Sequence, residues 1–176
     1  YARSRSSDNF PVQLSHTDSV PGITIYGQLL NLTSEGEVRI QSKDPKKAPV
    51  ITPNWLKTDY DKKAMLEMVR TMRRFVKQPA IAEYFGEELV PGNHCQSDSE
   101  ILDTVTRLST SGLHATGTCR MGRDSRSVVD NRLRVRGVSG LRVADCSIMP
   151  SLISGNTNGP AMAVSWKASD LILNEV

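Results

Sequence analysis

The sequence predicts an α+β fold in which an antiparallel pair of strands is combined with several helices. Two runs rich in β-branched residues, separated by a short polar turn, indicate the strand pair. Three later segments carry apolar residues at helical spacing, which indicates amphipathic helices. At 176 residues the chain is long enough to bury a core, and its composition indicates neither disorder nor a membrane span.

The chain begins with a polar, serine-rich stretch over residues 1–20 that has no sustained periodicity. We expect this stretch to form an extended surface lead-in. Its first residue is Tyr1 rather than methionine, and no apolar signal segment follows. We therefore expect a processed or cleaved product.

The predicted strands are "GITIYGQLLNL" (residues 22–32) and "GEVRIQS" (residues 36–42). Their β-branched content and the polar turn between them predict that they pair with each other in antiparallel fashion. The stretch "DPKKAPVITPNWL" (residues 44–56) contains three prolines. Because proline has no N–H to donate to a sheet, we assign this stretch to a loop.

A first helix is predicted from residue 61 to residue 77, where apolar side chains form one face and cationic side chains occupy the others. We assign the apolar stripe, methionines included, to a packed core face. Its members are Met65, Met68, Val69, Met72, Phe75 and Val76. A second helix is predicted after Ser97, because Glu100 follows at the spacing of a capping box ahead of an apolar run.

The last part of the chain predicts a short strand and a third helix. The apolar run over residues 141–144 indicates the strand, which ends at Asp145. Pro160 sits just inside the start of the helix, so residues 156–158 lie at its N-terminus. The residues expected to share its apolar face are Ala161, Val164, Ala168, Leu171 and Ile172.

Charge and cysteine content argue against several classes of protein. The 22 lysines and arginines nearly balance the 19 acidic residues, and no basic patch is interleaved with aromatics, so we expect no nucleic-acid partner. The three cysteines, Cys95, Cys119 and Cys146, are too few and too scattered for a disulfide scaffold, and we predict buried free thiols. We expect no metal site, because no second ligand pair completes a set with His114 and Cys119.

His114 is the strongest candidate for a general base, because the small residues around it allow a substrate to approach the imidazole. The alternative is an ordinary hydrogen-bonded histidine, which is the commoner fate of a lone histidine. The segment Asn156-Thr157-Asn158 also has two interpretations. Its asparagines either cap the last helix, or they and the helix N-terminus stabilise a developing anion.

Asp145, at the end of the predicted strand, is either a solvated turn carboxylate or a ligand contact. The sequence lacks the glycine-rich G-x-G-x-x-G motif, the P-loop and the nucleophile elbow G-x-S-x-G. The chain therefore does not hold a dinucleotide with a glycine-rich loop of its own. The residues alone indicate a histidine base that faces a helix N-terminus able to stabilise an anion.

Several stretches resemble the carboxy-terminal part of the glucose–methanol–choline (GMC) flavoprotein oxidoreductases. Three of them occur in the order of that family's closing motifs: "HATGTCRMG", "VVDNRLRVRGVSGLRVADCSIMPS" and "SGNTNGPAMAVSWKASDLI". A fourth, "GEVRIQSKDPKKAPVITPNWLKTDYD", resembles the passage before the family's long helix. The resemblance extends from about residue 23 to about residue 173.

The resemblance implies a fold and a division of the chain. Residues 1–127 would form part of a substrate-binding domain, built on an antiparallel sheet with helices. Residues 128–176 would supply a strand and a helix that complete an FAD-binding α/β domain. Most of that domain would come from an N-terminal part that is missing here, either as a separate chain or because it has been removed.

The resemblance also implies the activity and its residues. His114 matches the family's catalytic base, which takes the hydroxyl proton of an alcohol while a hydride passes to flavin N5. Asn156 matches the partner position, histidine or asparagine in different members, that hydrogen-bonds the substrate oxygen. The positions implied near FAD are Asp145, Cys146, Thr157 and Asn158. Arg134 and Val135 match a stretch that the family's oxidases place near the dioxygen side.

The leading hypothesis is therefore FAD-dependent oxidation of a small-molecule alcohol, with this chain providing the base and the substrate wall. Two alternatives remain within the same resemblance: a flavin-bearing lyase or cyclase of the hydroxynitrile lyase type, and an inactive isolated fragment. A third hypothesis from another class is a stand-alone binding or structural module. The sequence indicates neither the substrate nor the compartment.

Overall fold

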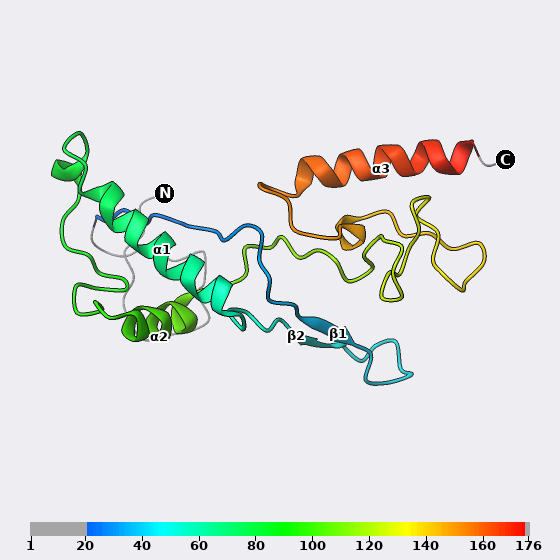
Figure 1. Ribbon diagram of the computed structural model, residues 1–176, viewed down its shortest axis with the longest axis horizontal. Coiled ribbons are helices and arrows are strands. Elements are labelled where there is room, and N and C mark those ends of the chain that lie inside the picture. The colour runs from blue at the N-terminus through cyan, green and yellow to red at the C-terminus, as the bar shows by residue number, and fades with distance from the viewer. Residues whose placement is uncertain (1–20, 175–176) are drawn as a thin grey trace. The chain divides into compact units, whose positions relative to one another are not determined.

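The computed structural model describes residues 21–174 (Figure 1). They form an α+β fold, which confirms the predicted class. In chain order the elements are the strands β1 (Glu37–Arg39) and β2 (Val50–Thr52), the helix α1 (Asp59–Val76), the 3₁₀ helix η1 (Ala82–Tyr84), the helix α2 (Asp98–Leu108), the 3₁₀ helix η2 (Cys146–Ile148) and the helix α3 (Asn158–Leu173). The predicted lead-in over residues 1–20 lies outside the described residues.

The described residues divide into two compact units. The first contains residues 21–29 and 56–111, and the second contains residues 30–55 and 112–174. The predicted boundary at residue 127 separates a substrate-binding part from a segment that would complete an FAD-binding domain. This boundary stays a prediction.

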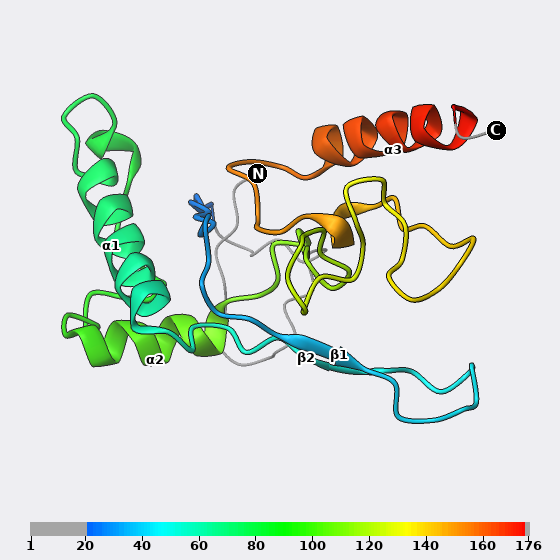
Figure 2. The ribbon, with the colours of Figure 1, turned by 45° about the vertical axis from the view of Figure 1, so that its right-hand side comes forward.

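The first unit is held together by packing of α1 against α2, which meet at a steep angle in Figure 2. The first turn of α1 is capped by Thr58, whose hydroxyl accepts a hydrogen bond of 3.2 Å from the Asp61 N–H. The predicted capping box at the start of α2 is confirmed. Ser97 Oγ accepts from the Glu100 N–H at 3.3 Å, and Glu100 Oε2 accepts from the Ser97 N–H at 2.9 Å.

The predicted first helix is confirmed as α1, but its predicted apolar face is only partly right. Leu66, which the prediction omitted, is 6% exposed and lies in the core, whereas Phe75 is 54% exposed. Part of the methionine stripe faces the segment before β1 instead. A Cβ atom on Gly27 would lie 2.0 Å from Met72 Cε, so the chain crosses α1 at that glycine. The apolar stripe of α1 therefore packs partly on the core shared with α2 and partly on the segment around Gly27, whereas its spacing had predicted a single core.

The predicted strand pairing is wrong. β1 lies within the second predicted strand, but it pairs antiparallel with β2, and Val38 lies opposite Ile51. β2 comes from the proline-rich stretch predicted as a loop; its three residues fit between Pro49 and Pro53, so neither proline occupies a ladder position. Residues 22–32 form no strand; residues 22–29 belong to the first unit and residues 30–32 to the second, and β1 takes β2 as its partner instead.

The second unit has its own core of Val129, Leu133, Ile148 and Ala168. The predicted strand at residues 141–144 is also wrong, because that segment contributes only an isolated bridge between Arg142 and Arg134. The left-handed backbone of Leu133, with φ of 65°, interrupts the extended segment just before Arg134. On the opposite segment, η2 begins at Cys146, soon after Arg142. This leaves room for a single bridge.

The third helix is confirmed as α3, and residues 156–158 lie at its start as predicted. Val164, Ala168 and Leu171 pack on the second core. Ile172 does not share this face as expected: it is 49% exposed, because one residue along an α-helix turns the side chain by about 100° from Leu171.

The cysteines are free, as predicted, but only Cys95 is buried. Cys119 and Cys146 are partly exposed: Cys119 lies on the loop after His114, and Cys146 is the first residue of η2, so neither lies in a core. None of the helices over residues 21–174 is long and apolar enough to cross a membrane.

Candidate functional site

The loop that carries His114 leaves α2 through a sharp local turn. Leu113 adopts a left-handed backbone with φ of 62° and is 80% exposed, so the chain bends at the residue next to the histidine. Further along, the loop is fixed to η2 by backbone hydrogen bonds. The Cys119 N–H donates to Ser147 O at 2.9 Å, and the Met121 N–H donates to Ile148 O at 2.7 Å.

The start of α3 lies against the same part of the unit. Thr157 is the N-cap residue of α3 and is only 9% exposed. Its carbonyl oxygen faces Cys146 Sγ at 3.9 Å, a weak contact that joins η2 to the helix start. Together, η2 and the N-terminus of α3 hold the loop of His114 beside residues more than forty positions away in sequence.

The imidazole of His114 makes two hydrogen bonds in this site. Its Nδ1 lies 2.8 Å from Thr157 Oγ1, and its Nε2 lies 3.0 Å from Asn156 Oδ1. An amide oxygen can only accept, so Nε2–H donates to Asn156 and, in the neutral ring, Nδ1 accepts from the Thr157 hydroxyl. The structure thus brings together three of the predicted site residues, and both ring nitrogens have partners.

The other residues predicted near the cofactor lie at η2 and at the start of α3. Asp145 caps η2 and accepts a 2.7 Å hydrogen bond from the Ser147 N–H. Hydrogen bonds from the Ser147 hydroxyl and N–H lower the pKa of Asp145, so this carboxylate stays ionised. Asn158 is exposed and is the first residue of α3.

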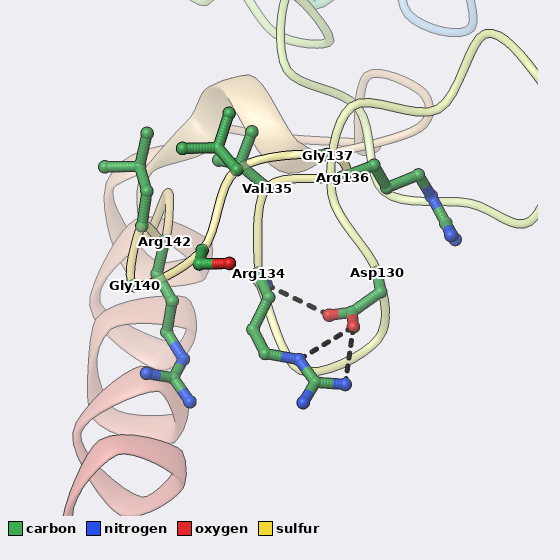
Figure 3. A pocket seen from close by; sticks show the side chains of 10 residues that line it. Asp130, Arg134, Val135, Arg136, Gly137, Gly140 and Arg142 are labelled. Carbon is green, nitrogen blue, oxygen red and sulfur yellow. Dashed lines mark hydrogen bonds and ion pairs between the residues drawn. The ribbon is translucent and has the colours of Figure 1, made fainter.

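Arg134 and Val135 lie elsewhere in the second unit and line a hollow of about 530 Å³ formed by Asp130 and residues 134–142 (Figure 3). Burial would raise the pKa of Asp130, but hydrogen bonds from the Arg134 N–H, the Arg134 guanidinium and the Arg132 N–H outweigh burial and lower the pKa to about 2. The lining includes neither His114 nor Asn156.

The arginines of this hollow do not converge on a common point. The Arg134 guanidinium pairs with Asp130 at 2.8 Å, and Arg136 donates to Gly122 O at 2.6 Å. Figure 3 shows Arg136 and Arg142 pointing to opposite sides. The hollow therefore results from the path of the backbone through this turn and is not an anion-binding site. Within residues 21–174, no group of three histidine, cysteine or acidic side chains is placed to hold a metal ion.

The sequence indicated His114 and Asn156 as site residues, but it gave no sign that the Thr157 side chain faces His114. The signal available in the sequence, a threonine just before a helix, predicts a capping residue. In the structure Thr157 occupies the N-cap position without a side-chain capping bond, and its hydroxyl faces His114 instead.

Comparison with known protein families gives one match over most of the chain. The family model described as GMC oxidoreductase matches residues 33–165. Mitochondrial choline dehydrogenase from Mus musculus is 43% identical over 145 residues, which cover 81% of this chain and 24% of the relative. Oxygen-dependent choline dehydrogenase from Escherichia coli O139:H28 is 40% identical over 139 residues, which cover 79% of this chain and 25% of the relative.

Solved structures agree with the sequence matches. Pyridoxine 4-oxidase from Mesorbium loti is 30% identical with a TM-score of 0.78, covering 82% of this chain and 28% of that protein. An FAD-dependent oxidoreductase from Chaetomium thermophilum is 31% identical with a TM-score of 0.78, covering 83% of this chain and 26% of that protein. The chain spans about a quarter of the length of the curated relatives it matches.

Proposed function

The chain belongs to the GMC oxidoreductase family, and from this premise we propose that it supplies the catalytic base and part of the substrate wall of an FAD-dependent enzyme that oxidises an alcohol. The observation that carries the proposal is the hydrogen-bonded cluster of His114, Asn156 and Thr157 at the N-terminus of α3. A shared fold alone would not specify this chemistry, whereas the cluster offers a base beside a polar group for the substrate oxygen.

In this proposal His114 takes the proton of the alcohol hydroxyl. Imidazole suits this task because it titrates near neutral pH. The substrate oxygen would replace the Asn156 side chain at Nε2, and Asn156 would then hold that oxygen through its amide. Leu113, exposed beside the histidine, would form an apolar wall for the carbon skeleton. The products are a carbonyl compound, a proton on His114 and a hydride for the acceptor.

The start of α3 fits FAD as the acceptor, which supplies a site for the hydride when it is bound. Cβ atoms built on Gly155 and Gly159 meet no heavy atom within 4 Å, so the backbone there is open to a flat ring. The N–H groups at the start of a helix lack partners within the helix and carry partial positive charge, which suits the anionic edge of a reduced flavin. Asn158 and the backbone of Thr157 would hold the group there, with Asp145 and Cys146 nearby.

We further propose that an FAD-binding part of the same protein covers the outer face of α3. Val164, Ala168 and Leu171 already pack on the second core, yet a further apolar stripe lies roughly opposite them on the helix. Its members are Met162, Trp166 and Leu173, which are 67%, 78% and 73% exposed. A helix that is apolar on opposite faces is normally buried between two partners.

The substrate class follows from the relatives, whose names include choline dehydrogenase and pyridoxine 4-oxidase. We propose an alcohol as substrate and choline as the first compound to test, because two relatives at 40% identity or above carry that name. A lyase of the same family would give no net oxidation, so substrate-dependent flavin reduction separates the two activities.

The test begins with a visible absorption spectrum and a denaturing intact-mass analysis of one purified sample. We expect flavin bands and polypeptide mass beyond that of this chain. Choline added without oxygen should then bleach the flavin. In His114→Ala the flavin should stay bound while bleaching slows by about 100-fold or more, the usual contribution of a general base.

His94→Ala is the matched control, because His94 is exposed and belongs to the first unit. It should leave bleaching unchanged. Equal bleaching rates in the wild type and His114→Ala would overturn the assignment of the base. A colourless sample that contains only this chain would refute the proposed assembly.

A further inference from the structure

Thr157 occupies the N-cap position of α3, but its hydroxyl does not cap the helix. Threonine is a favoured N-cap residue because its hydroxyl can accept a hydrogen bond from the first turn of a helix. Thr157 occupies the N-cap position of α3 and makes no such bond. Its hydroxyl lies 2.8 Å from His114 Nδ1, and the residue is only 9% exposed. The structure therefore directs this hydroxyl to the imidazole rather than to the helix.

We infer that Thr157 is a positioning residue that determines which imidazole nitrogen of His114 is free to act as the base. This inference rests on the proposed function, because it concerns the proton transfer assigned to His114. Thr157 touches His114 in the structure and acts on the substrate only through that ring. Its role is therefore distinct from the cofactor contact that the family resemblance implies for the same residue.

The chemistry depends on the two-way character of a hydroxyl, which can both donate and accept. With Asn156 Oδ1 as its partner, Nε2 carries the proton, and the Thr157 hydroxyl donates to Nδ1. For Nε2 to accept a proton from an alcohol, the ring proton must sit on Nδ1 instead. The Thr157 oxygen then accepts from Nδ1–H, and this bond persists after Nε2 has gained the substrate proton.

Removal of the hydroxyl should disable the base without removing the ring. In Thr157→Val, which keeps the shape of the side chain, an Nδ1–H group would face a buried methyl group without an acceptor. A buried donor without a partner is unfavourable, so the ring keeps its proton on Nε2 and donates it to Asn156. We expect flavin reduction to be about 10- to 100-fold slower, while Thr157→Ser, which retains the hydroxyl, recovers most of the loss.

The experiment uses the flavin-loaded protein in three forms: wild type, Thr157→Val and Thr157→Ser. Stopped-flow absorbance without oxygen gives the limiting rate of flavin reduction and the apparent affinity for choline. ¹⁵N NMR of the histidine rings reports, independently of activity, which nitrogen of His114 carries the proton and whether Nδ1 is hydrogen-bonded. Thr104→Val is the matched control, because Thr104 is also a buried threonine but contacts Cys95 Sγ at 3.3 Å.

The inference predicts a lower limiting rate in Thr157→Val, an affinity for choline within about threefold of the wild type, and loss of the hydrogen-bonded Nδ1 signal. Thr104→Val should show the wild-type rate and signal. A wild-type rate in Thr157→Val would overturn the inference, as would a wild-type protein whose Nδ1 shows no hydrogen bond. If Thr157→Val does not fold, that wild-type signal and the rate of Thr157→Ser still decide.

The same data separate failure of the inference from failure of the proposed function. A wild-type protein whose flavin is reduced neither by choline nor by other primary alcohols would refute alcohol oxidation and, with it, the role of Thr157 in proton transfer. Normal reduction in the wild type together with an unchanged Thr157→Val would refute the inference alone.

Discussion

Replacement of Asn156 by aspartate should slow proton abstraction far more than its small change in shape suggests. Asn156 Oδ1 accepts from His114 Nε2 at a distance of 3.0 Å. Aspartate has the same size but presents a negative charge, and it can no longer donate to a substrate oxygen. Asn156→Asp should therefore hold the ring proton on Nε2 and also repel the alkoxide that develops at the same place.

Two effects give the magnitude. A hydrogen bond to a charged acceptor is about twice as strong as a neutral one, which adds about 1 kcal/mol in favour of the Nε2–H form. Two unit charges about 4 Å apart repel by about 1 kcal/mol in water and about 4 kcal/mol near a protein surface. Asn156 is exposed and His114 is half-buried, so we place the repulsion at about 2 kcal/mol. The sum of about 3 kcal/mol corresponds to roughly a hundredfold slower flavin reduction.

The assay is the limiting rate of flavin reduction by choline without oxygen. Asn93→Asp introduces the same charge at an exposed loop position of the first unit and should leave the rate unchanged. Asn156→His, the alternative residue that the family resemblance implies for this position, should retain more activity than Asn156→Asp. Flavin reduction at the wild-type rate in Asn156→Asp would show that Nε2 does not face the substrate oxygen.

Three further predictions concern stability and assembly. Arg73→Met should lower the free energy of unfolding by about 2 to 3 kcal/mol in urea titrations, because it removes a two-pronged pair with Glu88 whose side chains are only 17% and 25% exposed; an unchanged urea midpoint would contradict this. Asp130 has a pKa lowered from 3.8 to about 2, so its contribution to stability is complete above about pH 4 and is lost as the pH falls towards 2. Asp130→Asn should flatten this part of the pH profile of the urea midpoint, and an identical profile would exclude Asp130 as its source. Trp166→Ala should weaken flavin retention and lower the Tm of the flavin-loaded protein, because a tryptophan covered by the FAD-binding part contributes about 3 kcal/mol or more to the stability of the assembly. Lys167→Ala, beside that face, is the control and should change neither property. Equal losses in both variants would argue against the covered face.

Local signals in the sequence predicted the helices well. The Ser97 and Glu100 capping box is complete within one turn of chain, and the structure contains both of its hydrogen bonds. The third helix likewise begins where Pro160 indicated. These features depend on neighbours three or four residues apart, so no tertiary contact is needed to specify them.

The strands could not be predicted in the same way, because a strand is defined by its partner. β1 was expected to pair with the run before it, but its partner is a three-residue segment between two prolines. β-propensity depends strongly on context, so the composition of residues 22–32 did not decide their conformation. The face of α1 shows the same limit, because two separate partners divide one stripe.

The sequence by itself determined the helices, the capping box of α2 and the motifs that place this chain in its family and single out His114 and Asn156. Only the tertiary structure decided how these residues meet. The packing of the His114 loop against η2 and the start of α3 brings the imidazole to residues 42 and 43 positions away. It also turns the Thr157 hydroxyl from the helix cap to the imidazole. A residue pair so far apart in the chain meets only through the packing of the elements between them, which no local pattern encodes.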